Sequence, residues 1–207
     1  MNVEKFWDNL AEKYSKSPVR NEEVYQYKLN KTNEFLKPDS LALEWGCGTG
    51  TTAIHHAPSV QHMTATDISN NMLDIARKRA AEAEVSNITF THSTVEAFEA
   101  DPESFDAILA LNVVHLLDDP NACINKAFYL LKPGGVFITS IPCLGDTLFS
   151  YWRILIPIFQ LIGKAPSVQY MKRKNVEEDL AATGFEIAFA REPIKGEAAF
   201  IIARKPH

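Results

Sequence analysis

Three glycines and two acidic residues mark the part of the chain best suited to hold a ligand. In LALEWGCGTGTT, residues 41–52, a short apolar run reaches Glu44 and then Gly46, Gly48 and Gly50. Glycine adopts positive φ and lets a ligand approach the backbone closely. Between a strand and a helix, such a loop also exposes amide donors at the helix start. Asp67 lies further along, in TATDIS, where a second strand is predicted to end.

The spacing and charge of these residues limit the classes of ligand that the loop could bind. G-x-G-x-G followed by Thr51 differs from the G-x-G-x-x-G of a dinucleotide site, and the G-K-S/T of a P-loop is absent. An ionised carboxylate accepts two donors side by side, so Asp67 suits the two hydroxyls of a ribose, although alone it would equally suit a helix cap. Glu44 would repel a pyrophosphate, but it could pair with a cationic ligand or hold loop amides. S-adenosylmethionine, a positively charged nucleoside without phosphate, fits both carboxylates.

The surrounding segments alternate between strand and helix patterns. Five apolar segments, at residues 40–45, 62–68, 87–93, 104–114 and 135–141, are separated by segments that read as helices. Such alternation predicts right-handed βαβ units and a parallel sheet. Two more strand patterns, at 185–191 and 198–205, predict a C-terminal antiparallel hairpin. We therefore expect an α/β fold with a doubly wound, seven-stranded, mostly parallel sheet and helices on both faces.

The helix patterns have recognisable beginnings and ends. Phe6, Leu10 and Tyr14 are four residues apart and predict an N-terminal helix, and a second helix is expected over about residues 22–36. Three later helices are expected at 70–84 after a Ser69 cap, at 118–131 before KPGG, and at 175–185. We expect a single domain over residues 1–207, with a helical cap (1–37), a cofactor-binding core (38–143), an apolar lid (144–174), and a C-terminal helix and hairpin (175–207).

The composition of the chain indicates which kinds of partner and which cellular compartment to expect. The formal net charge of −5 disfavours nucleic acid as a main partner. Cys47, Cys123 and Cys143 are far apart and form no C-x-x-C, which predicts reduced thiols in a cytoplasmic protein. The first residues show no signal-peptide pattern. The longest apolar stretch, residues 154–163, falls well short of the roughly 20 residues that span a membrane, so no stable membrane insertion is expected.

With these residues in view, the chain resembles the class I S-adenosylmethionine-dependent methyltransferases. LEWGCGTG is similar to their first motif, E/D-x-G-x-G-x-G, and ATDISNNML, FDAILALNVVHLL and LLKPGGVFITS are similar to the motifs at their second, fourth and fifth strands. The resemblance covers residues 41–141 well and the ends more loosely. It is nearest to the small-molecule group that includes ubiquinone and menaquinone biosynthesis methyltransferases, whose W-x-x-x-A-x-x-Y opening FWDNLAEKY resembles. The resemblance implies a Rossmann-like fold, S-adenosyl-L-methionine as cofactor and S-adenosyl-L-homocysteine as product.

The resemblance also implies roles for individual residues. Asp67 would hold the ribose, Ile68 would pack on the adenine and Met72 would cover its edge. Gly46, Cys47, Gly48 and Gly50 would line the methionine part, with Glu44 orienting the loop or approaching the amino group. HSTVE stands where the family usually has G-D-A, so Thr94 supplies no carboxylate, and adenine recognition would be weaker or would use the Thr94 hydroxyl and the Val95 amide. Leu111 and Asn112 would lie beneath the transferring methyl group.

Two side chains are candidates for acting on the acceptor. His115 follows the fourth strand and is the best candidate general base, with a packed histidine that shapes the pocket as the other interpretation. Tyr14 would cap the site, or would only pack its helix. His55, His56 and His62 match no metal-ligand spacing and are interpreted as a solvated helix end, so no metal is expected.

The acceptor is expected to be a small molecule, apolar or aromatic, methylated on O, N or C. Residues 147–163 are rich in apolar side chains and could form a pocket wall, a membrane-surface contact, or a helix packed on the body or on a second subunit. A monomer or a homodimer is consistent with these options. The alternative function is a non-catalytic S-adenosylmethionine sensor or scaffold.

Overall fold

The computed structural model describes residues 2–19, 21–143, 167–191 and 198–207. Its centre is a seven-stranded sheet in the order β3-β2-β1-β4-β5-β7-β6. The strands are β1 (Leu41–Trp45), β2 (His62–Asp67), β3 (Ile88–His92), β4 (Phe105–Leu111), β5 (Leu131–Ile141), β6 (Glu186–Arg191) and β7 (Ala199–Arg204). The first five pair in parallel, whereas β7 is antiparallel to both β5 and β6. The predicted doubly wound, mostly parallel sheet is therefore confirmed.

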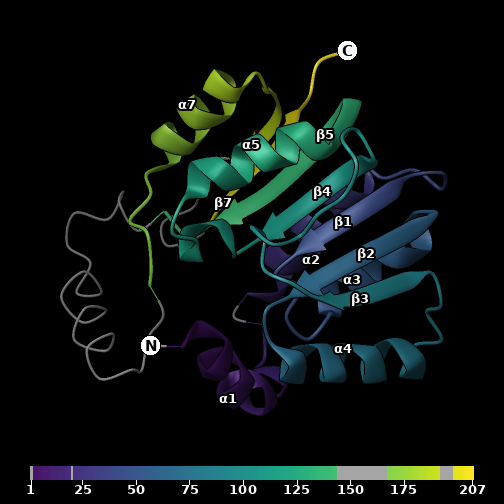
Figure 1. The fold of residues 1–207 in the computed structure, drawn as a ribbon. Helices are drawn as coiled ribbons and strands as arrows, with labels where there is room; N and C mark the ends of the chain where they lie inside the picture. Colours follow the sequence, from purple (N-terminus) through teal and green to yellow (C-terminus); the bar gives the residue numbers. More distant parts are fainter. Residues whose placement is uncertain (1, 20, 144–166, 192–197) are drawn as a thin grey trace.

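Helices cover both faces of the sheet (Figure 1). They are α1 (Val3–Ser15), α2 (Glu22–Asn33), α3 (Thr51–His56), α4 (Asn70–Glu82), α5 (Pro120–Leu130) and α7 (Arg173–Thr183), with short 3₁₀ turns η1 (Ala57–Ser59) and η2 (Val114–Leu116). Alternate residues of β1 point to opposite faces. Leu43 and Trp45 join the cluster under α5 and α7, and Ala42 joins the cluster under α3 and α4. The sheet is thus buried on both sides.

Two element boundaries differ from the sequence expectation. The second helix ends at Asn33 rather than near residue 36, because Phe35 N and Leu36 N bond to Thr32 O and Asn33 O in tight turns. The fifth strand begins at Leu131, where KPGG was expected to be a break. There the pairing of β5 with β4 changes register between Phe105 and Ala107, so Pro133, Gly134 and Gly135 form an irregularity within the strand.

The connections bring the carboxyl ends of β1, β2, β3 and β4 to one edge of the sheet, as parallel pairing requires. Helix α1 lies beside α4 at that edge (Figure 1). The predicted capping of α4 is confirmed, because Ser69 Oγ accepts a hydrogen bond from Met72 N at 3.1 Å. No helix within the described residues is long and apolar enough to cross a membrane.

Candidate functional site

The three glycines after β1 have different surroundings. All have positive φ, at 63°, 54° and 77° for Gly46, Gly48 and Gly50. A Cβ on Gly46 would lie 2.8 Å from Val113 Cγ2, and one on Gly50 would lie 2.7 Å from Ala76 Cβ, so these two glycines let the loop pack against the end of β4 and against α4. A Cβ on Gly48 would meet only Tyr14 Cε1, at 3.8 Å. Gly48 is therefore where the loop backbone is open to a ligand.

Asp67 accepts hydrogen bonds from the loop after β1 and from the turn after β2. Its Oδ2 accepts from Gly48 N at 2.8 Å, and its Oδ1 accepts from Ser69 N at 2.9 Å. Burial raises the pKa of Asp67, and the amides of Ser69 and Gly48 offset part of that rise. Each carboxylate oxygen has a second lone pair available. Asp67 therefore organises the glycine loop and can still accept further donors.

Glu44 is buried at the end of β1, with only 3% of its surface exposed. Its Oε2 has no hydrogen-bond partner, and no ion pair to Glu44 is found among the described residues. Burial, and then the charge of Asp67, raises the pKa of Glu44 to about 8. The free carboxyl is consequently neutral for the most part at pH 7.

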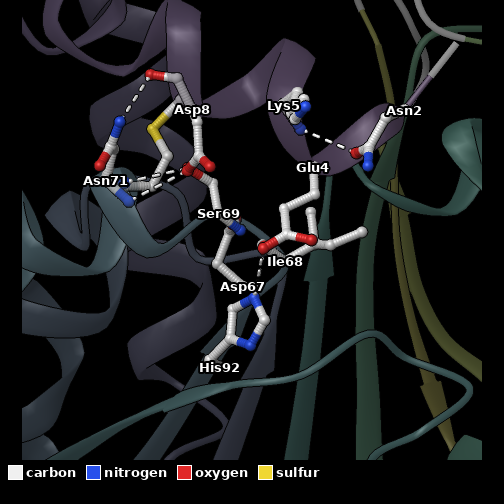
Figure 2. A network of polar contacts seen from close by, with 10 residues as sticks. Asn2, Glu4, Lys5, Asp8, Asp67, Ile68, Ser69, Asn71 and His92 are labelled. Carbon is white, nitrogen blue, oxygen red and sulfur yellow. Dashed lines mark hydrogen bonds and ion pairs between the residues drawn. The ribbon is translucent and has the colours of Figure 1, made fainter.

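Helix α1 covers this edge through polar contacts (Figure 2). Asp8 Oδ1 accepts from Ser69 Oγ at 2.6 Å and from Asn71 N at 3.1 Å. His92 Nε2 donates to Ile68 O at 2.7 Å and lies 3.3 Å from Glu4 Oε1. These contacts attach α1 to the residues that follow Asp67 and to His92, which pairs with Asp67 on the neighbouring strand.

Tyr14 lies over the loop at the end of the same helix. Its side chain is 52% exposed, yet its pKa is raised, first by burial and then by the negative charges of Asp67 and Glu44. The ring thus borders Gly48 and the two carboxyl groups together. The role of Tyr14 as a cap of the site remains a prediction.

The residues at the end of β4 lie beside the glycine loop and form the next part of the candidate site. Leu111 is half-buried, and Asn112 is exposed with φ of 58° and donates its amide to Ser140 O at 2.8 Å. His115 follows in η2 and is 9% exposed, and its Nδ1 has no hydrogen-bond partner. Burial lowers the pKa of His115 to about 4, so the ring is neutral at pH 7. Its carbonyl accepts from Gln169 N at 2.7 Å, which brings the chain that follows residue 166 against η2.

The remaining predicted cofactor residues follow β2 and β3. Ser93 N donates to Asp67 O at 3.1 Å, so the exit of β3 lies beside Asp67. The Thr94 hydroxyl accepts from Ala97 N at 3.1 Å, and Val95 is 5% exposed within the apolar cluster. Met72 is 2% exposed, so its side chain is packed into the protein. The structure thus brings the predicted residues to one edge, with Cys47 buried in the loop.

Some residues at this edge were not singled out from the sequence. Arg79 on α4 donates to Thr49 Oγ1 at 2.7 Å, to Thr51 Oγ1 at 3.0 Å and to Ser15 O at 2.7 Å, which joins the glycine loop to α1. Lys28 on α2 donates to Ser140 Oγ at 2.8 Å. These pairs are up to 112 residues apart in the chain. No local spacing signals them, because they depend on how distant elements pack.

The prediction of a solvated histidine cluster was wrong for His56. His55 is exposed, but His56 is fully buried, with Nδ1 2.7 Å from Asn33 Oδ1. His62 is half-buried and bonds to Thr89 Oγ1 at 3.0 Å. No cluster able to hold a metal ion is found in the described part of the chain. The apolar stretch 147–163 lies outside the described residues.

Comparison with known proteins finds a methyltransferase domain within the chain. A family of methyltransferase domains matches residues 42–135, which contain the glycine loop, Asp67 and the end of β4. A ubiquinone biosynthesis O-methyltransferase of Vibrio cholerae is 32% identical over 117 residues, 56% of this chain and 46% of that protein. Residues 42–135 of the chain therefore match a methyltransferase domain. The chain spans less than half of that relative's own length.

Solved structures share the fold. Phosphoethanolamine N-methyltransferase 2 of Haemonchus contortus, in complex with phosphomonomethylethanolamine and S-adenosylhomocysteine, superposes with a TM-score of 0.73 at 19% identity, over 88% of this chain and 53% of that one. The cyclase SpnF superposes with a TM-score of 0.74 at 17% identity, over 92% and 85%. Because one of these neighbours is named a cyclase, fold alone does not assign an activity.

Proposed function

We propose that this protein transfers the methyl group of S-adenosyl-L-methionine to a small acceptor, apolar or aromatic, at O, N or C. The observation that carries the proposal is the open backbone at Gly48, bordered by the carboxyl groups of Glu44 and Asp67 within the segment that matches the methyltransferase domains. The acceptor class, the individual site roles and the activity of the whole protein are part of this proposal.

The residues at the site fit the cofactor. Asp67 keeps an unused lone pair on each oxygen for the two ribose hydroxyls, and Ile68 and Met72 follow it, where the adenine would lie. The Thr94 hydroxyl and the Val95 amide would meet the adenine from β3. Glu44 offers an oxygen without a partner to a positively charged group. An anionic pyrophosphate would be repelled by the carboxylate of Asp67, which disfavours a dinucleotide.

Catalysis would depend mainly on position and on exclusion of water. The cofactor supplies a methyl group on a sulfonium, which is already a good leaving group. Asn112 and Leu111 would border the path of the methyl group, and Tyr14 would cover the loop from α1. This arrangement favours alignment of two bound molecules, which is a large part of what catalysis requires here.

His115 is the proposed general base where the acceptor must lose a proton. Its ring is neutral at pH 7 and its Nδ1 has no hydrogen-bond partner, so a lone pair is available for a proton. The lowered pKa of His115 makes it a weak base, so this role suits acceptors that lose their proton readily. Gln169 N donates to His115 O, so the chain at residue 169 lies beside His115. The apolar side chains of residues 147–163 would then form the wall of an acceptor pocket.

Two measurements test the function. Calorimetric titration should show micromolar binding of S-adenosylmethionine and S-adenosylhomocysteine and none of NADH. A panel of lipophilic phenols and amines, incubated with S-adenosylmethionine, should then yield S-adenosylhomocysteine with at least one acceptor. Binding without turnover on any acceptor would favour the alternative of a sensor or scaffold, and a tight NADH complex would overturn the proposal.

A further inference from the structure

Glu44 is a buried ionisable group whose carboxyl lacks a hydrogen-bond donor at one oxygen. The side chain is 3% exposed, and Oε2 has no hydrogen-bond donor. Asp67, by contrast, receives two backbone amides. An unpaired charge in a protein interior costs several kcal/mol after relaxation. A carboxyl in this position avoids most of that cost by keeping its proton.

The groups that face Glu44 from the neighbouring elements are all acidic. The charge of Asp67 on β2 raises the pKa of Glu44 after burial does. The pKa values of Tyr14 on α1, Tyr25 on α2 and the Cys47 thiol in the loop are raised first by burial, with the charge of Glu44 as a further cause. Tyr25 hydrogen-bonds to Thr52 at 3.3 Å, so its hydroxyl is held on this side of the loop. No lysine, arginine or histidine pairs with Glu44 among the described residues. The protein itself therefore provides no positive charge that would favour ionisation of Glu44.

We propose that Glu44 carries a proton in the free protein and gives it up to solvent when the ammonium group of the cofactor binds beside it, so that cofactor binding and proton release are coupled at one residue. This inference rests on the proposed function. A positive charge within about 4–6 Å favours the ionised form of a carboxyl. The O–H bond of Glu44 breaks, the proton passes to the buffer, and the carboxylate remains paired with the ligand.

The raised pKa of Glu44 sets the number of protons that ligand binding is expected to release. With its pKa raised to about 8, roughly nine-tenths of the protein molecules carry the proton at pH 7. Binding of a ligand with an ammonium group should then release between about 0.5 and 1 proton. A ligand with the same nucleoside and no ammonium group should release almost none.

Calorimetry in several buffers measures this number directly. The enthalpy of S-adenosylhomocysteine binding at pH 7 should vary with the ionisation enthalpy of phosphate, HEPES and Tris, with a negative slope whose size equals the number of protons released. The same titration with 5′-methylthioadenosine, which lacks the amino-acid end, should give a slope near zero. This comparison uses the unmodified protein, so it does not depend on the folding of a variant.

Two variants test whether the released proton comes from Glu44. Glu44→Gln should abolish the slope with S-adenosylhomocysteine, whereas the control Asp74→Asn, on the exposed side of α4, should retain it. Any proton exchanged by the amine of the ligand itself persists in Glu44→Gln and can be subtracted. Binding without proton release, or equal release in Glu44→Gln, would overturn the inference and leave the proposed function intact. Failure of both nucleosides to bind in any buffer would overturn the proposed function itself.

Discussion

At the scale of single residues, Glu44 also affects folding. The pKa of its carboxyl rises from 4.5 to about 8 on folding, so between these pH values the folded protein holds a proton that the unfolded chain has lost. Stability therefore falls as the pH rises through this window. We expect Glu44→Gln to raise the free energy of unfolding at pH 7 by on the order of 1–3 kcal/mol, because the carboxyl is replaced by a neutral group.

Urea unfolding of the two proteins at pH 7 and at pH 4.5 tests this expectation. The gain should shrink toward zero at pH 4.5, where the carboxyl is protonated in the folded protein and half protonated in the unfolded chain. A Glu44→Gln protein that is less stable than the original at pH 7 would show that the carboxyl makes a stabilising contact.

Asp67 is expected to contribute to affinity through its two oxygens. Asp67→Ala removes the acceptor for Gly48 N as well as the proposed ribose contact. We expect it to weaken binding of S-adenosylhomocysteine by about 1–3 kcal/mol, the range for a lost hydrogen bond to a charged group. Calorimetry checks this, with Asp74→Ala as the control, because Asp74 pairs with Arg77 on the exposed side of α4. Unchanged affinity in Asp67→Ala would contradict the role of Asp67.

At the scale of elements, α1 depends on polar contacts. Ala11 is its only fully buried residue, and Asp8 supplies acceptors to both Ser69 and Asn71. We expect Asp8→Ala to speed hydrogen exchange of the α1 amides by roughly tenfold, because local opening needs few apolar contacts to be broken. Glu12→Ala is the control on the same helix, since its carboxylate pairs with the exposed Lys16. Equal exchange in both variants would mean that packing alone holds α1.

The contact between α2 and α3 is expected to weaken in acid. Burial lowers the pKa of His56 to about 3 from 6.5, so below pH 6.5 the unfolded chain binds a proton that the folded protein does not. Stability conferred by the neutral ring is present above pH 6.5 and is lost as the pH falls toward 3. From pH 7 to pH 5 this loss is on the order of 1–2 kcal/mol.

The pH dependence of unfolding in His56→Gln measures the contribution of His56. This variant should lose less stability between pH 7 and pH 5 than the original protein, while the exposed neighbour variant His55→Gln should behave like the original. The comparison between proteins is needed because Glu44 acts in the opposite sense in the same window. Parallel curves for all three proteins would show that His56 is not held neutral.

At the scale of the whole molecule, the sequence predicted what depends on local pattern. Strand alternation and the glycine loop predicted the sheet, its antiparallel end and the edge where Glu44 and Asp67 lie. Burial of His56 was missed because its partner, Asn33, is 23 residues away on another helix. The links from Arg79 to Ser15 and from Asp8 to Ser69 were missed for the same reason. Contacts between residues that only the packing of distant elements brings together have no regular spacing in the sequence by which they could be predicted.

The proposed cofactor residues and the proposed acceptor residues lie in different parts of the chain. The segment that matches the methyltransferase domains, residues 42–135, holds most of the proposed cofactor contacts, whereas the apolar residues 147–163 follow it. If those apolar side chains line the acceptor pocket, the double variant Trp152→Ser and Phe159→Ser should bind S-adenosylhomocysteine within about twofold of the original affinity. Its kcat/KM for the best acceptor of the panel should fall at least roughly tenfold, the scale of 1.4 kcal/mol of lost apolar contact.

Two further measurements on the double variant separate the other interpretations of this segment. Loss of a dimer in light scattering would indicate a subunit contact, and loss of sedimentation with anionic vesicles would indicate a membrane-surface contact. Weakened nucleoside binding together with weakened turnover would place the segment against the cofactor rather than the acceptor. Because the acceptor must reach the methyl group from the side that the nucleoside leaves open, we expect only acceptor kinetics to change.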